Sequence, residues 1–359
     1  MKKIIFTALL IFTCASLLFA QQNTTSKEIT FTSADGKISY GGTLTLPAGK
    51  KKFPALVFVS GTGRQDRDGL MAGHKIFLDI ANELVKNGYA VLRMDDRGVG
   101  KTTGNYETAT TEDFANDALL ALHQLTAYDQ IDKKRIGMIG HSEGGAAMSI
   151  AAAKSSDVKF IISLSGLAQN GFDALISQNE SIVNNAKLPV YDKKRSNEIN
   201  ALMFRTALKY ADSTNMETKL NETYNQWKVK DDAYFKTLNI EFDHFRFPVY
   251  SYVNYATGPW YRYFVKYNAK KTMAKIKVPV LAINGDKDNY VVAETNLKNW
   301  KEYIAAGGNK KVETHLLKNV NHLLLACVTC DQAEIANIKT GVAPQVTEII
   351  IEWLNRNIK

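Results

Sequence analysis

A serine between two glycines is the residue pattern with the clearest potential for chemistry. An apolar run over Ile136–Ile139 leads into Gly-His-Ser-Glu-Gly at 140–144, and small residues follow over Ala146–Ala153. This order predicts a buried strand, a sharp turn and a helix, with glycine needed where the two backbones approach too closely for a Cβ atom. Ser142 at the apex is therefore the candidate nucleophile, with its hydroxyl exposed by the strained turn.

The base for this serine must come from elsewhere in the chain, because a serine hydroxyl is a weak nucleophile without one. His322 follows the last predicted strand, and open α/β sheets place their active sites at the carboxyl ends of strands. His141 precedes the serine and is expected to point away from it. Structural roles are the simpler interpretation for the other histidines, His74, His123, His244 and His315. His322 is the candidate base.

The base in turn needs an acid that orients it. Two aspartates compete for this role, Asp286 and Asp288, in the loop after the penultimate predicted strand. Asp286 could cap the turn, whereas Asp288 lies further into the loop, and spacing alone leaves the choice open. Either aspartate gives the chain order serine, aspartate, histidine.

Two backbone N–H groups are candidates to bind the oxyanion of an acyl-transfer reaction. One belongs to Glu143, directly after the serine at the start of a predicted helix. The other belongs to Thr62, with Gly63 as the fallback, in the loop after the first central strand. The charged segment Arg64–Asp68 is expected to brace this loop through ion pairs, with Arg97 as a candidate partner.

A second loop, Asp95–Thr102, contains two glycines and ends in Gly-Lys-Thr, which superficially resembles a phosphate-binding loop. The full pattern needs a glycine where Asp95 stands. We therefore interpret this segment as a structural turn.

The elements that must position these residues alternate along most of the chain. Strands are predicted at 28–32, 37–46, 53–60, 89–94, 135–139, 160–165, 278–284 and 312–317, and helices at 76–86, 113–125 and 347–357. The first two strands form a hairpin pattern around Asp35-Gly36. Strands alternating with helices predict a mostly parallel sheet covered by helices on both faces.

Residues 166–272 break this alternation and are predicted to form a helical cap over the sheet. Aromatic side chains concentrate in Phe242–Tyr267. Most of them are expected to form the core of the cap. Trp260 and Tyr263 are the candidates to line a substrate pocket, because aromatic rings combine large apolar faces with polar edges.

The first twenty residues predict a signal peptide and therefore an exported protein, periplasmic or secreted. Lys2 and Lys3 precede an apolar run, and Ala20 precedes a polar segment. The run is too short for a stable membrane span, and the residues before Cys14 are a poor match to a lipid-anchoring signal. The formal charge of the chain is +9. The lysines of the chain are scattered and form no basic stripe, so nucleic acid is a poor candidate partner.

Two cysteines remain after removal of the signal peptide, Cys327 and Cys330. No thioredoxin-like pattern precedes them, and a local disulfide fits an oxidising compartment. A zinc site would need further ligands, and only His322 is nearby in the sequence.

Together these motifs resemble exported bacterial α/β-hydrolases of the esterase and serine-aminopeptidase-like group. The matching segments are 60–63, 65–68, 96–100, 140–145, 259–264, 284–288 and 321–322. The resemblance implies the α/β-hydrolase fold, with a core formed by residues 21–165 and 273–359 and a cap formed by 166–272. It also favours Asp288 over Asp286 as the acid.

The resemblance implies hydrolysis of a carboxylic ester by Ser142, His322 and Asp288 through an acyl-enzyme. A small ester or a short peptide is the expected partner, and no metal or organic cofactor is required. A serine aminopeptidase or an acyltransferase is the alternative. An aminopeptidase would need an anionic pocket for the substrate amine, and no acid in the cap clearly supplies one. A non-catalytic binding protein is the third interpretation, and the oligomeric state is not indicated.

Overall fold

The computed structural model describes residues 24–49, 51–330 and 332–359. The predicted signal peptide at 1–20, including Cys14, lies outside the described residues. In the part that is described, no helix combines the length and the apolar character needed to cross a membrane.

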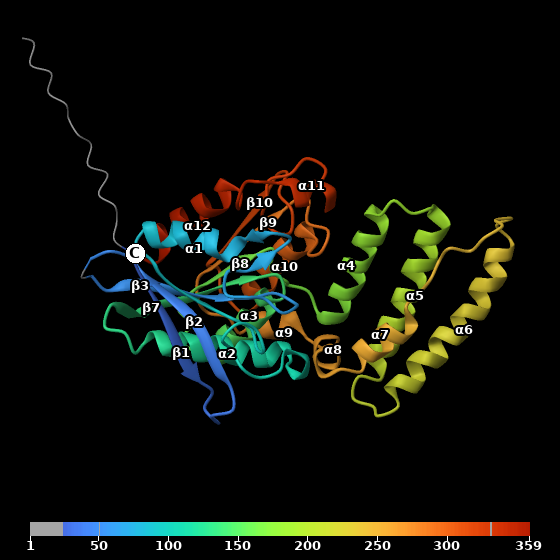
Figure 1. The fold of residues 1–359 in the computed structure, drawn as a ribbon, viewed down its shortest axis with the longest axis horizontal. Coiled ribbons are helices and arrows are strands. Elements are labelled where there is room, and N and C mark those ends of the chain that lie inside the picture. Colours follow the sequence, from blue (N-terminus) through green and yellow to red (C-terminus); the bar gives the residue numbers. More distant parts are fainter. Residues whose placement is uncertain (1–23, 50, 331) are drawn as a thin grey trace, which may run out of the picture.

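One sheet of eight strands forms the centre of the molecule (Figure 1). The strands are β1 (Thr25–Thr32), β2 (Ser39–Leu46), β3 (Phe53–Val59), β6 (Ala90–Met94), β7 (Ile131–His141), β8 (Ile161–Leu164), β9 (Val280–Gly285) and β10 (Val312–Leu317). Their order is β1-β2-β6-β3-β7-β8-β9-β10. The pairs β1·β2 and β2·β6 are antiparallel, and all pairs from β6 to β10 are parallel. The predicted hairpin and the mostly parallel sheet are confirmed.

Helices cover both faces of this sheet. The helices α1 (Ile76–Lys86) and α12 (Pro344–Asn357) pack on one face, and α2 (Thr111–Leu125), α3 (Gly144–Lys154) and α10 (Ala293–Ala306) on the other (Figure 1). Every residue of β3 is buried, with Leu56 and Phe58 facing α1 and Val57 facing α2. Burial on both faces is typical of a parallel strand covered by helices.

The segment between β8 and β9 is helical. Its helices are α4 (Gly171–Asn185), α5 (Val190–Lys209), α6 (Met216–Lys236), α7 (Val249–Ala256), α8 (Pro259–Phe264) and α9 (Ala269–Met273). Figure 1 shows α4, α5, α6 and α7 projecting to one side of the sheet. Buried Arg195 links α5 to α6 through Asp231, with Nε 2.6 Å from its carboxylate, and it also binds Asp192 and Asp243.

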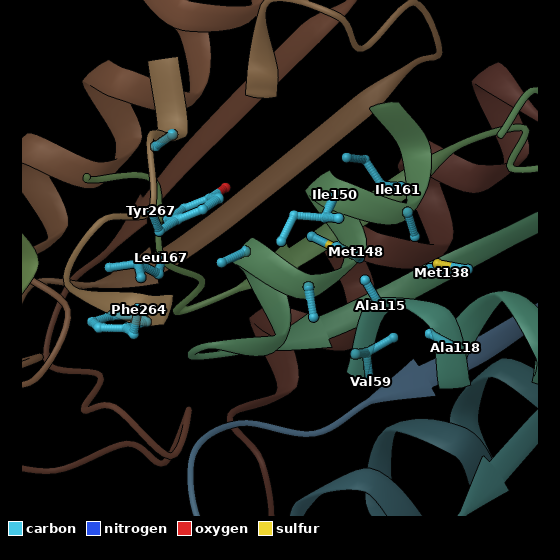
Figure 2. Close-up of a cluster of buried hydrophobic side chains, with 14 of the residues drawn as sticks. Val59, Ala115, Ala118, Met138, Met148, Ile150, Ile161, Leu167, Phe264 and Tyr267 are labelled. Atoms are coloured by element: carbon cyan, nitrogen blue, oxygen red, sulfur yellow. The ribbon is translucent and has the colours of Figure 1, made fainter. Parts of the chain in front are cut away.

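A continuous hydrophobic cluster joins the sheet to the base of the cap. Met148 and Ile150 of α3 lie at its centre, and Leu167, Phe264 and Tyr267 extend it toward the cap (Figure 2). Because this cluster is buried throughout, the base of the cap is fixed against the sheet by packing.

Short elements complete the fold. They are β4 (Leu70–Met71) paired with β5 (His74–Lys75), the 3₁₀ helix η1 (Tyr106–Thr108), and α11 (Gln332–Asn337). None of them has a counterpart among the predicted elements, since two to six residues are too few to establish a periodicity.

Candidate active site

Ser142 occupies the predicted turn between β7 and α3. Its φ of +55° is the left-handed conformation, which is strained for a residue with a side chain. A Cβ atom at Gly140 would lie 2.5 Å from the carbonyl oxygen of Gly144, and one at Gly144 would lie 2.3 Å from that of Val59. The prediction that glycine is required by close backbone approach is therefore confirmed.

His322 and Asp288 meet at the carboxyl ends of β10 and β9. Nδ1 of His322 is 2.8 Å from Oδ2 of Asp288. The other carboxylate oxygen of Asp288 accepts from the backbone N–H groups of Tyr290 and Val291 at 2.9 and 2.8 Å. Asp286 is exposed and accepts instead from the backbone N–H of Asn319. Of the two predicted aspartates, Asp288 is the one placed against the imidazole.

Ser142 and His322 line the same cavity. Because Nδ1 of His322 binds Asp288, Nε2 is the ring nitrogen left to exchange a proton with the nucleophile. No hydrogen bond joins these two side chains, both of which are described, and nucleophile–base pairs are often loose without substrate. The structure therefore brings Ser142, Asp288 and His322 to one place in the fold.

His141 holds the candidate base in place, a contact that the sequence did not reveal. Its Nε2–H donates to the backbone carbonyl of His322 at 2.8 Å, and the two rings are 4.7 Å apart. Burial, with the neighbouring His322, lowers the pKa of His141 to about 3, so its imidazole is neutral at physiological pH. A neutral ring can support the backbone of His322 without placing a second positive charge beside it.

The loop after β3 lies against the candidate nucleophile. A Cβ atom at Gly61 would be 2.9 Å from the Cβ of Ser142. The backbone N–H of Gly63 is already bound to the Tyr106 hydroxyl at 2.7 Å. The N–H groups of Thr62 and Glu143 have no acceptor within the described chain, so they are the ones available to an oxyanion.

The side chain of Glu143 is buried beside this loop, 4% exposed. Its carboxylate accepts from the hydroxyls of Thr62 and Thr111, both at 2.6 Å, and from the indole Nε1–H of Trp260 at 2.7 Å. Burial raises the pKa of Glu143, and these three hydrogen bonds oppose that rise. This cluster was not predicted, because its members come from four separate segments of the chain.

Ion pairs brace the loop after β3, residues 60–68, which we call the oxyanion loop. Bracing by ion pairs was predicted, but the partners differ. Arg67 binds the Asp95 carboxylate at 2.6 Å, and Asp68 binds Arg93. The prediction that Arg97 pairs with this loop is wrong, because Arg97 binds Asp117 of α2 at 2.7 Å.

The loop after β6 acts as a structural turn. Buried Asp96 accepts from the Ser60 hydroxyl at 2.5 Å and from the backbone N–H of Gln65 at 2.8 Å, which ties this turn to the oxyanion loop. Burial, with repulsion from Glu143 and Asp117, raises the pKa of Asp96 to about 7.

A cavity of about 1130 Å³ separates these residues from the cap. Trp260 lines it, but Tyr263 does not. The prediction of Tyr263 as a pocket residue fails because its hydroxyl turns toward Glu112 at the start of α2. Arg246 and Lys287 are the charged side chains of the lining apart from histidine, and none of its described residues is an aspartate or a glutamate.

Cys327 and Cys330 form a disulfide in the loop between His322 and α11. Cys330 lies on the cavity wall. In the described part of the chain, no group of histidine, cysteine and acidic side chains is arranged to hold a metal ion.

Comparisons with known proteins identify the family and the fold. The model of the X-Pro dipeptidyl-peptidase (S15) family matches residues 41–323. Esterase EstD of Thermotoga maritima is 24% identical over 303 residues, which are 84% of this chain and 60% of the relative. The chain thus spans less than two thirds of the length of that relative.

Solved structures give the same fold at lower identity. The Pyrococcus furiosus esterase Pf2001 is 17% identical, with a TM-score of 0.55 over 93% of this chain and 92% of that one. The α/β-hydrolase GrgF from Penicillium sp. sh18 is 19% identical, with a TM-score of 0.55 over 93% of this chain and 99% of that one.

The sheet order, the turn at Ser142 and these structural neighbours define an α/β-hydrolase. Within that class, the chain belongs to the X-Pro dipeptidyl-peptidase (S15) family, whose model covers most of its length. The predicted resemblance to esterases and serine peptidases of the α/β-hydrolase superfamily is confirmed.

Proposed function

We propose that the protein is a serine hydrolase that cleaves carboxylic esters. The observation that carries this proposal is that Ser142 and His322 line one cavity, while Nδ1 of His322 is bonded to Asp288 behind it. A hydroxyl, a base and an orienting carboxylate in this chain order are the parts needed for nucleophilic acyl transfer.

In the proposed reaction, Oγ of Ser142 attacks the ester carbonyl while Nε2 of His322 accepts its proton. Asp288 keeps the remaining proton on Nδ1 and stabilises the imidazolium. The backbone N–H groups of Thr62 and Glu143 bind the negative oxygen of the tetrahedral intermediate. His322 then protonates the leaving alcohol, and a water activated by the same histidine releases the acid from Ser142.

A second candidate function is peptide hydrolysis, which the S15 family match favours. A peptidase that recognises a free N-terminus needs a negative group to pair with the substrate ammonium. Among the described residues of the cavity lining, the charged side chains besides histidine are Arg246 and Lys287. Two cations repel an ammonium group, and this observation places the ester above the peptide.

A substrate panel tests the proposal directly. Purified protein would be assayed on p-nitrophenyl esters from acetate to decanoate and on aminoacyl and Xaa-Pro p-nitroanilides. We expect ester turnover that falls by at least about 10³-fold in Ser142→Ala, with an unchanged melting temperature, since only a hydroxyl is removed. Two results would reject the ester assignment. One is ester turnover that survives in Ser142→Ala, and the other is a wild type that turns over anilides faster than esters.

We also propose that the protein is exported. Lys2 and Lys3 with the apolar run that follows them support this, and so does the Cys327–Cys330 disulfide, since such bonds persist in oxidising compartments. Fractionation of cells that express the full chain, with mass spectrometry of the N-terminus, should find a product that begins near Gln21 outside the cytoplasm. A full-length cytoplasmic product would contradict export.

A further inference from the structure

The Glu143 carboxylate accepts hydrogen bonds from three separate parts of the molecule. Thr62 belongs to the oxyanion loop, Thr111 to the first turn of α2, and Trp260 to α8 of the cap. Among the described residues no cation pairs with Glu143, and all three partners are neutral donors. Each donor therefore matters, because a buried carboxylate that loses a hydrogen bond is strongly destabilised.

The tie to Thr62 fixes the part of the oxyanion loop that faces the nucleophile. Gly61 is packed against Ser142, and Gly63 is held through its N–H by Tyr106. Between these two points the Thr62 hydroxyl donates to Glu143, which sets the direction of the Thr62 peptide unit. This support continues into the cap, because Trp260 of α8 donates to the same carboxylate.

The hydrogen bond from Trp260 connects the wall of the substrate cavity to the same carboxylate. The indole lines the cavity and stacks on Phe264, with ring centroids 4.7 Å apart and planes 12° apart. An acyl group that fills the cavity would press on the indole and hold its N–H toward Glu143. Glu143 itself does not line the cavity, so its side chain does not reach the substrate.

We propose that the Glu143 carboxylate is a positioning group that couples Trp260 in the cap to the oxyanion loop at Thr62, so that an acyl group filling the cavity aligns the oxyanion donors. This inference rests on the proposed ester hydrolysis. It assigns to Glu143 a role for its side chain that is separate from the role of its backbone N–H.

The coupling predicts a kcat that depends on acyl length. In the wild type, kcat should rise from p-nitrophenyl acetate to p-nitrophenyl decanoate. Trp260→Phe keeps a ring on Phe264 but removes the N–H, and it should lower kcat for decanoate about tenfold while leaving KM within about twofold. Loss of alignment costs less than the 10²–10³-fold loss caused by removal of a whole oxyanion donor.

Variants of Glu143 separate positioning from stability. Glu143→Gln keeps an acceptor for Trp260 and Thr111, and the Thr62 hydroxyl can rotate to accept from the new amide, so kcat should stay within about threefold of wild type. Glu143→Leu fills the same space without an acceptor and should lose the dependence on acyl length. Trp227→Phe is the matched control, because Trp227 is buried in α6 of the same cap outside the cavity lining. It should lower the melting temperature and leave kcat unchanged.

A double-mutant comparison gives the most direct test of coupling. Thr62→Val replaces the hydroxyl with a methyl group of similar size. The Thr62→Val/Trp260→Phe variant should lose no more kcat than the worse single variant, because both changes break one chain of contacts. Additive losses would overturn the proposal, as would a Glu143→Leu variant that keeps wild-type kcat.

Failure of the proposed ester hydrolysis can be told apart from failure of the coupling. In that case the wild type itself would show no ester turnover that depends on Ser142. Crystal structures of the wild type and of Trp260→Phe report on the coupling without any turnover. A displaced Thr62 peptide unit in the variant supports the proposal, and an unmoved loop refutes it.

Discussion

Replacing Asp288 by asparagine should inactivate the enzyme while leaving its structure intact. Oδ1 of Asp288 accepts two backbone N–H groups, those of Tyr290 and Val291, while Oδ2 faces Nδ1 of His322. In Asp288→Asn the two N–H groups select the amide oxygen, because the amide NH₂ cannot accept from them. The NH₂ group must then point at His322, which is forced to carry its proton on Nε2.

A histidine protonated on Nε2 cannot take the proton of Ser142. The corresponding change in a well-studied serine protease lowers kcat about 10⁴-fold, which is about 5.5 kcal/mol of transition-state stabilisation. We expect a loss of that order here, because the geometry of the imidazole and the carboxylate is the same in kind.

The assay is steady-state hydrolysis of p-nitrophenyl butyrate, with Asp286→Asn as the matched control. Asp286 is exposed and accepts one backbone N–H, which an asparagine oxygen can also accept, so turnover should change less than about twofold. An Asp288→Asn enzyme within tenfold of wild type, or an Asp286→Asn enzyme that is equally damaged, would refute this reasoning.

Three further predictions concern specificity, pH and packing. Trp260→Ala should change the ratio of kcat/KM between long and short acyl esters by about tenfold, since it opens the cavity wall; a uniform loss across the ester panel would show that the indole does not meet the substrate. Burial raises the pKa of Asp96 from 3.8 to about 7, so the contribution of Asp96 to stability should fall as pH rises from about 4 to about 7, by up to about 4 kcal/mol. Urea unfolding at both pH values should therefore find Asp96→Asn gaining stability relative to wild type as pH rises, and a constant difference would contradict the raised pKa. Gly144→Ala places a Cβ 2.3 Å from the carbonyl oxygen of Val59, and thermal unfolding should show about 1–3 kcal/mol of destabilisation together with reduced turnover; a variant as stable and active as wild type would show that the turn can relax.

The helices that flank the sheet could be predicted from local patterns. The helix α1 is predicted and found at Ile76–Lys86, because one apolar stripe and the following Gly88 define both of its ends. The N-cap of α2 is Thr110, a residue type typical of this position, and its hydroxyl accepts from the backbone N–H of Asp113. These features depend on residues within a few positions of one another, which is the information that a sequence carries directly.

The positions of the candidate site residues could be predicted because strand ends converge. Ser142, Asp288 and His322 each follow a parallel strand, and the carboxyl ends of such strands share one edge of the sheet. The choice of Asp288 over Asp286 depended on family resemblance, since both carboxylates lie in one short loop and only its fold decides which faces the imidazole.

Side-chain partners across distant segments could not be predicted in the same way. Both acidic partners of Arg97, Asp113 and Asp117, belong to α2, so its pairing depends on how α2 lies on the sheet. Trp260 and Tyr263 are both aromatic residues of the short helix α8, and only its rotation decides which faces the cavity. The hydrogen bonds of Glu143 require the cap, α2 and the oxyanion loop to be assembled first.

The cap enters and leaves the sheet at two strands that are hydrogen-bonded neighbours, β8 and β9, with Leu164 beside Ile283. Topologically, everything between them is one loop closed on adjacent strands. The entropy of closing a loop grows only with the logarithm of its length, so each doubling costs about 0.6 kcal/mol. Closure entropy therefore sets little limit on the length of the segment between these two strands, and the packing of its base against the sheet is the stronger constraint on its sequence.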